Sequence, residues 1–174
     1  MSEQLFSGHA FNRIYKDQIL VKLTNSLENH NGYRFKTGLN IDSIPFNPDG
    51  ECQPGGIYFC QLEDLHLWLN YSDSPIVFVR FVTIPDDALI YTEKNKFKAD
   101  RLILGNRMKI GDLKVWKDLE YCLAAVKHNG LALRFVKQQT QEICMAAVFN
   151  DHRALPFVNK KYLDLAFTKL YGPI

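Results

Sequence analysis

The residues best suited to chemistry lie in and around the stretch Cys52-Gln-Pro-Gly-Gly-Ile-Tyr-Phe59. Gly55 and Gly56 permit positive φ and let a backbone or a ligand come close, and Tyr58 follows them in an apolar strand. If Tyr58 and Lys36 project from adjacent strands onto one face, tyrosine offers a surface for stacking a ring and lysine a point charge for phosphate. The stretch would then border a pocket, and Asn40 completes this candidate set.

The same stretch has a second, purely structural interpretation. A Pro-Gly pair is typical of a type II turn, and this turn would simply lead into a core strand. Tyr58 would then pack under the helix that follows, and Lys36 would point into water. The sequence leaves both interpretations open. It argues against a phosphate-cradling loop, because such loops lead into a helix N-terminus and this one leads into a strand.

Composition and charge exclude several classes of function. The 174 residues include 21 basic and 19 acidic side chains, with no block of like charge, so nucleic-acid binding is not indicated. No apolar run is long enough to span a membrane. The first residues lack the basic and apolar regions of a signal peptide, so we expect an intracellular protein that is not secreted.

The four cysteines predict no metal site. Cys52, Cys60 and His66 match no common zinc spacing, and a fourth ligand is missing. Cys122 and Cys144 occupy equivalent points of an internal repeat described below, where a small buried side chain is expected. We therefore predict that both thiols are reduced, buried and unpaired.

Residues 1–114 read as one α+β domain with a mostly antiparallel sheet and one or two helices. Residues 1–12 look like a loosely held lead-in. The segment 13–27 favours a helix, although its centre, residues 19–23, fits a strand equally well. The remaining predicted elements are a strand at 33–37, a loop at 41–50, a helix at 61–71, and strands at 76–84, 88–91 and 97–104.

Arg80 interrupts the most apolar strand, Ile76–Ile84, which we expect at the centre of the sheet. A guanidinium cannot be left unpaired in a core, so Arg80 should reach solvent at a sheet edge or meet a carboxylate. Asp100 and Asp42 are the candidate partners.

Residues 115–174 contain an internal repeat. Glu120–Val136 and Glu142–Val158 are offset by 22 residues, and nine of their seventeen aligned positions are identical. Asp164–Leu170 resembles the start of a third copy. A fixed period of this size is typical of stacked helical units that cannot bury their apolar faces alone. We therefore predict a helical-repeat tail of two and a half copies, packed on the sheet domain.

Four motifs carry a resemblance to a known family. They are Lys36-Thr-Gly-Leu-Asn40, Cys52–Phe59, Ile84-Pro-Asp-Asp-Ala88 and Lys98–Leu104. Together they resemble an uncharacterised family of giant-virus (mimivirus-type) proteins over about residues 30–160, and the 22-residue repeat is similar to helical repeats of unknown function in the same viruses. The resemblance implies a viral protein of the host cytoplasm or the virion, and it implies no activity.

A more distant likeness, to ADP-ribosyltransferase-like folds, rests on the Gly-Ile-Tyr-Phe strand and the Val- and Ile-rich strands after it. In those enzymes an aromatic residue and a residue of the first strand hold NAD. The likeness implies that Tyr58 takes the aromatic position and that Arg34 or Lys36 takes the first-strand position, where His or Arg is typical. A late acidic residue would have to be Asp87 or Glu93.

Two classes of function therefore remain. The favoured one is a non-catalytic module that binds an unidentified protein partner, needs no cofactor and uses its helical repeats for binding. The alternative is an NAD-binding relative of the ADP-ribosyltransferases, active or degenerate, whose candidate pocket comprises Arg34, Lys36, Asn40, Gly55, Gly56 and Tyr58.

Overall fold

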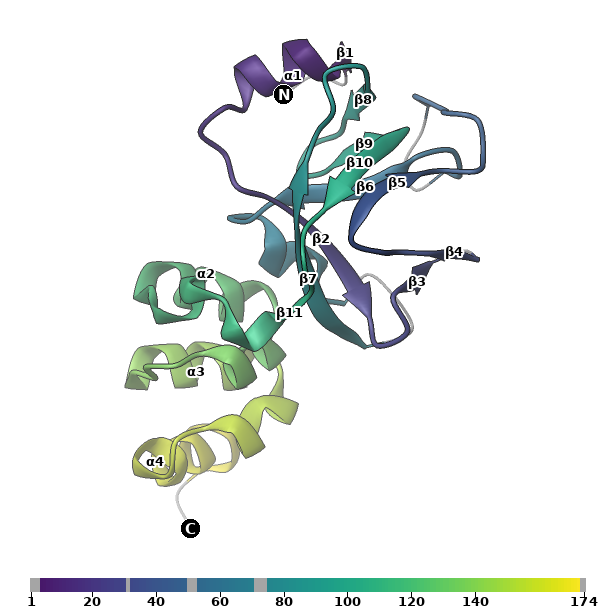
Figure 1. The fold of residues 1–174 in the computed structure, drawn as a ribbon. Coiled ribbons are helices and arrows are strands. Elements are labelled where there is room, and N and C mark those ends of the chain that lie inside the picture. The colour runs from purple at the N-terminus through teal and green to yellow at the C-terminus, as the bar shows by residue number, and fades with distance from the viewer. Residues whose placement is uncertain (1–3, 31, 50–52, 71–74, 173–174) are drawn as a thin grey trace. The chain divides into compact units, whose positions relative to one another are not determined.

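The computed structural model describes residues 4–30, 32–49, 53–70 and 75–172. It divides the chain into two compact units (Figure 1). The first comprises residues 1–65 and 70–108, and the second comprises residues 66–69 and 109–174. The fold is α+β, as predicted: a large antiparallel sheet and a helical C-terminal part. The expectation that the tail packs on the sheet domain stays a prediction.

The first unit is built around a nine-stranded antiparallel sheet. Eight strands follow the order β1-β8-β9-β6-β2-β7-β10-β5, and β11 pairs with β7. Their bounds are β1 Gln4–Ser7, β2 Leu20–Asn25, β5 Gly38–Ile41, β6 Ile57–Gln61, β7 Ile76–Thr83, β8 Leu89–Thr92, β9 Phe97–Ala99, β10 Arg101–Leu104 and β11 Met108–Lys109. A separate small hairpin joins β3, Asn29–His30, to β4, Tyr33–Arg34.

The sheet closes on itself through a bend at Asp100. This residue alone separates β9 from β10, which the sequence predicts as one strand. β9 pairs with β6 and β8, whereas β10 pairs with β7 and β5. The path from β9 through β6, β2 and β7 therefore returns to β10, as in a small barrel. Asp100 supports the bend, because its N–H donates to Leu89 O at 3.1 Å and its carbonyl accepts from Asp42 N at 3.0 Å.

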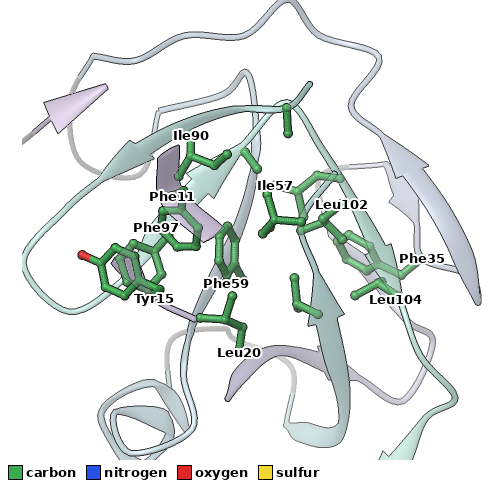
Figure 2. Close-up of a cluster of buried hydrophobic side chains, with 14 residues drawn as sticks. Phe11, Tyr15, Leu20, Phe35, Ile57, Phe59, Ile90, Phe97, Leu102 and Leu104 are labelled. Atoms are coloured by element: carbon green, nitrogen blue, oxygen red, sulfur yellow. The ribbon is translucent and has the colours of Figure 1, made fainter. Parts of the chain in front are cut away.

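An aromatic cluster fills the core of this unit (Figure 2). The ring centroids of Phe11 and Phe97 lie 5.0 Å apart and those of Phe59 and Phe97 lie 5.2 Å apart. Phe11 comes from α1, Gly8–Ile14, and stacks on Tyr15 one turn later at 4.4 Å. The loosely held lead-in expected for residues 1–12 is therefore wrong for the described part, since β1 pairs with β8 and Phe11 is fully buried.

The helix favoured at residues 13–27 is also wrong. α1 ends at Ile14, and the segment 20–25 is the strand β2, so the strand alternative was the correct one. β2 lies between β6 and β7, and residues 20–24 are all buried because both of its faces are covered. The leucine spacing that suggested a helix reflects this two-sided burial.

Two further predicted elements are shorter than expected. The strand at residues 33–37 is only β4, and the following Gly38–Ile41 forms β5 where the sequence suggested an end. The helix at residues 61–71 is reduced to a single 3-10 turn, η1, Leu65–Trp68, because β6 continues through Gln61. Tyr71 lies outside the described residues.

The second unit contains the predicted repeat. Its helices are α2 Leu119–His128, α3 Gln141–Asn150 and α4 Lys160–Tyr171, and its 3-10 segments are η2 Ile110–Asp112, η3 Lys114–Lys117, η4 Gly130–Phe135 and η5 His152–Phe157. The pair α2 and η4 recurs as α3 and η5 with the 22-residue offset. α3 packs against both α2 and α4.

The third copy differs at its start. Asp118 and Thr140 accept hydrogen bonds from Tyr121 N and Ile143 N and so cap α2 and α3. The equivalent third residue is Tyr162, which is no N-cap, and Asn159 caps α4 instead by accepting from Lys161 N at 3.2 Å. α4 therefore begins at Lys160, before the predicted Asp164.

The two repeat cysteines are buried and unpaired, as predicted. Cys122 and Cys144 are fully buried, and so is Ala166, which takes their place in the third copy. Burial raises the pKa of Cys122 to about 11 and also raises the pKa of Cys144. The three helices thus share one small-residue position at their packed faces.

Candidate functional site

The glycine turn is held by neighbouring protein groups. Gly55 has φ +94° and accepts a hydrogen bond from Asn47 N at 2.9 Å, while a side chain at Gly55 would collide with Pro45 O. Gly56 has φ +133°, donates to Asp42 Oδ2 at 2.7 Å and packs against the Lys98 side chain. Both glycines are needed for positive φ and for the close approach of this chain itself.

Tyr58 belongs to a row of side chains across three strands. The register places Tyr58 of β6 opposite Lys98 of β9, which is in turn opposite Tyr91 of β8. Lys98 is 0% exposed, and its Nζ lies 5.4 Å from the Tyr58 ring centroid. Lys96 Nζ lies 4.7 Å from the same ring and forms an ion pair with Glu93 at 3.0 Å. The Tyr58 ring therefore contacts two lysines, Lys98 of β9 and Lys96 of the turn before β9.

The structure does not bring Lys36 to Tyr58 on an adjacent strand. Lys36 is exposed and lies between β4 and β5, and β5 pairs with β10, whereas β6 pairs with β9 and β2. Arg34 is exposed on the β3–β4 hairpin. Of the predicted set, the glycines and Tyr58 stay together because they are consecutive in the chain.

Asn40 has a structural role in β5. Its side chain is fully buried, accepts from Lys36 N at 3.1 Å and donates to Lys36 O and Gly38 O, both at 2.8 Å. These bonds close the turn that leads into β5. The two acidic candidates are also engaged, since Asp87 pairs with Arg101 at 2.9 Å and Glu93 with Lys96.

Arg80 meets a carboxylate, as predicted, but the partner is Glu28. Its Nε and Nη2 donate to the two Glu28 oxygens at 2.8 and 2.9 Å, and its Nη1 donates to Thr37 Oγ1 and Gly105 O. Asp100 binds Arg101 and Asp42 binds Gly56, so neither suggested partner is correct. The Arg80 hydrogen bonds hold the pKa of Glu28 below its usual range.

Lys22 is buried in the sheet as well, like Arg80 and Lys98. It lies on β2 directly opposite Arg80, and its Nζ sits 4.8 Å from the Phe35 ring centroid. Burial lowers the pKa of Lys22 to about 8. The sequence analysis did not predict a buried Lys22. It favoured a helix for residues 13–27, and in a helix Lys22 would lie on the polar face.

Two sets of exposed apolar side chains each belong to one part of the fold. One set lies on the tail and comprises Phe149, Phe157, Leu165, Phe167 and Tyr171; we call it the tail surface. The other lies on the outer face of β5, β10 and β7, where the register aligns Leu39 with Ile103, and includes Ile41 and Phe81. We call it the sheet surface. Large exposed apolar patches are typical of protein contacts.

Within the described residues no group of three or more His, Cys, Asp or Glu side chains could hold a metal ion. Over the same residues, no helix has the length and apolar character needed to cross a membrane. Cys52, part of the zinc combination considered above, lies outside the described residues.

Comparison with known proteins finds a matching family model and several related viral proteins. Residues 118–163, which cover the repeat, match the family described as Domain of unknown function (DUF4116). The chain is 33% identical over 111 residues to Uncharacterized protein R869 of Acanthamoeba polyphaga mimivirus, an alignment spanning 60% of this chain and 78% of that protein. No solved structure matches the chain.

Two further relatives from the same virus are longer. Putative ankyrin repeat protein R229 is 35% identical over 122 residues, or 65% of this chain, and R868 is 29% identical over 126 residues, or 68% of this chain. The chain spans 38% and 58% of their lengths. None of these three descriptions names an ADP-ribosyltransferase. Since this chain covers more than two thirds of R869 at 33% identity, it belongs to the family of that uncharacterised mimivirus protein.

Proposed function

We propose that this chain is a non-catalytic protein-interaction module that binds its partner through the tail. The observation that carries the proposal is the tail surface, a set of large apolar side chains left exposed on a stack of repeated helices. Stacked repeats offer extended binding surfaces and carry no chemistry of their own. The names of R229 and R868, putative ankyrin repeat proteins, agree with such a role.

The sheet surface is the weaker candidate for binding. Its outermost strand, β5, would be the natural place for a partner strand to add. However, the Tyr33 hydroxyl donates to Asn40 Oδ1 of β5 at 3.4 Å, so this tyrosine lies against the strand. On the tail, Phe149 and Tyr171 are 61% and 66% exposed.

An affinity-capture experiment in infected cells tests the proposal. The tagged chain is compared with a variant carrying Phe149→Ser, Leu165→Ser and Phe167→Ser, and a second control carries Leu39→Ser on the sheet surface. We expect one defined protein that the unmodified chain and Leu39→Ser both recover and that the tail variant loses. Equal recovery by all three chains, with the tail variant still folded, would show that the tail surface is not the binding site.

A further inference from the structure

The three helices of the tail carry one pattern of side chains on their outer faces. Each helix buries the opposite side, where the repeat places Cys122 in α2, Cys144 in α3 and Ala166 in α4. The outer side holds three positions, spaced three and four residues apart, that recur at the 22-residue offset. Since α3 packs on both α2 and α4, equivalent positions line up in rows across the stack (Figure 1). The rows are an acidic row of Glu120, Glu142 and Asp164, an apolar row of Leu123, Met145 and Phe167, and a third row of Lys127, Phe149 and Tyr171.

The acidic row is open to solvent. Glu120, Glu142 and Asp164 are all exposed, and no hydrogen bond or ion pair with another described residue engages their carboxylates. The helix dipole accounts for Glu120 and Glu142, because they lie in the first turns of α2 and α3. It does not account for Asp164, which is the fifth residue of α4. No lysine or arginine recurs in all three copies, so no basic row accompanies the acidic one.

The apolar row lies one helical turn from the acidic row. Leu123 and Met145 are half-buried, and Phe167 is 43% exposed. One turn further on, Phe149 and Tyr171 are exposed as well. Met145 and Phe149 stay accessible although α3 has a helix on each side, so the stacking of the repeats does not cover this face. A face that sets apolar side chains beside unpaired carboxylates is complementary to a partner with apolar and basic side chains.

We propose that this outer face binds an extended, basic segment of a partner protein that carries a lysine or arginine at every third residue. Axes of packed helices lie about 8–10 Å apart, which sets the spacing of the carboxylates along the acidic row. A polyproline II segment makes one turn in three residues and advances about 9.3 Å in doing so. One side of such a segment can therefore offer one cation to each helix, while an apolar residue of every turn lies over the apolar row. This inference rests on the proposed interaction role of the tail and names the chemical class of its partner.

Fluorescence anisotropy of a labelled synthetic peptide with the full chain tests the spacing. The probe consists of three Leu-Pro-Lys units with both ends capped, and the control peptide has the same composition with its lysines in one block. We expect saturable binding of the probe, weakened by salt and about tenfold tighter than that of the control peptide. Equal binding of the two peptides, or no binding of the probe, would overturn the proposal.

Removing the carboxylates tests the acidic row itself. Glu142→Gln should weaken probe binding by up to about fivefold, and its combination with Glu120→Gln and Asp164→Asn by roughly tenfold or more. Asp112→Asn is the matched control, because Asp112 is an exposed carboxylate of η2 outside the rows. It should bind the probe as the unmodified chain does. Undiminished binding by the triple variant would contradict the proposal.

A charge exchange gives a readout that loss of folding cannot imitate. Glu142→Lys should bind the probe more weakly than the unmodified chain, and it should prefer a probe whose second lysine is replaced by glutamate. The unmodified chain should show the opposite preference. The same preference in both chains would overturn the assignment of the central contact. If the capture experiment finds a partner that depends on the tail while the probe does not bind, this inference fails and the proposed function stands.

Discussion

Arg80 and Glu28 form a buried bidentate ion pair between residues 52 positions apart, with N–O distances of 2.8 and 2.9 Å. Glu28 holds a φ of +53°, a left-handed conformation that residues with a side chain seldom adopt. The carboxylate also accepts from Thr24 Oγ1 and lies 3.5 Å from Arg107 Nη1. The pair explains how a strand in the middle of a barrel-like sheet tolerates a guanidinium, and it connects the turn after β2 to β7.

Glu28→Gln should destabilise the chain strongly. The substitution keeps the shape of the side chain but leaves the buried Arg80 charge without its counterion, which costs about 3–5 kcal/mol. Urea unfolding followed by circular dichroism measures the change. Asp87→Asn is the matched control, because it breaks an ion pair with Arg101 in which Asp87 is largely exposed, and such pairs contribute about 1 kcal/mol or less.

The same pair predicts acid sensitivity. The pKa of Glu28 is lowered from 4.5 in the folded chain, so its stabilising contribution is present above that value and is lost as the pH falls through the lower folded pKa. The difference in unfolding free energy between the unmodified chain and Glu28→Gln should therefore shrink on acidification. A difference that stays constant down to pH 2 would contradict the assignment.

Lys22→Met should stabilise the chain at neutral pH. The pKa of Lys22 is about 8 in the folded chain against 10.5 for the free side chain. At pH 7 this lowered pKa reduces the free energy of unfolding by about 3 kcal/mol. This penalty fades as the pH rises from about 8 to 10.5, because the unfolded chain then loses the proton as well. The advantage of Lys22→Met in unfolding free energy should be largest at pH 7 and smallest at pH 10.5. An advantage independent of pH would contradict the lowered pKa.

Cys122 and Cys144 should resist alkylation in the native chain. Both are fully buried, and burial raises both pKa values, so little thiolate is present or accessible at pH 8. Iodoacetamide labelling followed by peptide mass spectrometry should find both residues unmodified until denaturant is added. Labelling of either one at the rate of a free thiol would show that the stacked helices open readily.

Titration calorimetry with NAD should show no binding. The ring of Tyr58 contacts Lys96 and Lys98, and Lys36 lies away from its strand, so the stacking and phosphate groups of the candidate pocket do not converge. A saturable heat that Tyr58→Ala abolishes, with the fold intact, would revive the ADP-ribosyltransferase alternative.

The parts of the fold that the sequence predicts well have local causes. β7 is a nearly continuous apolar run, and the tail repeats its own sequence pattern. Short stretches of sequence are therefore enough to predict this strand and these helices. The misassigned β2 is different, because its two buried faces erase the alternation that marks a strand. Missing β2 also hid Glu28, since only the pairing of β2 with β7 brings that residue to Arg80.

The neighbours of the glycine turn could not be predicted for a similar reason. The residues of the glycine turn predict the turn itself. Which strands lie beside it depends on the bend at Asp100, because β6 pairs with β9 before the bend and β5 pairs with β10 after it. No local sequence pattern predicts such a bend. Phe11 was missed because a single aromatic residue on a two-turn helix has too little periodicity to predict a core position.

Site-specific photo-crosslinking in infected cells tests the interaction role of the tail most directly. A photoreactive amino acid replaces Tyr171 or Phe149 on the tail surface, and Ile41 on the sheet surface serves as an exposed apolar control. We expect a defined crosslinked protein, a second copy of the chain or another partner, from the tail positions and none from Ile41. Crosslinks from Ile41 alone, or from none of the three positions, would contradict the proposal that this chain binds through its helical tail.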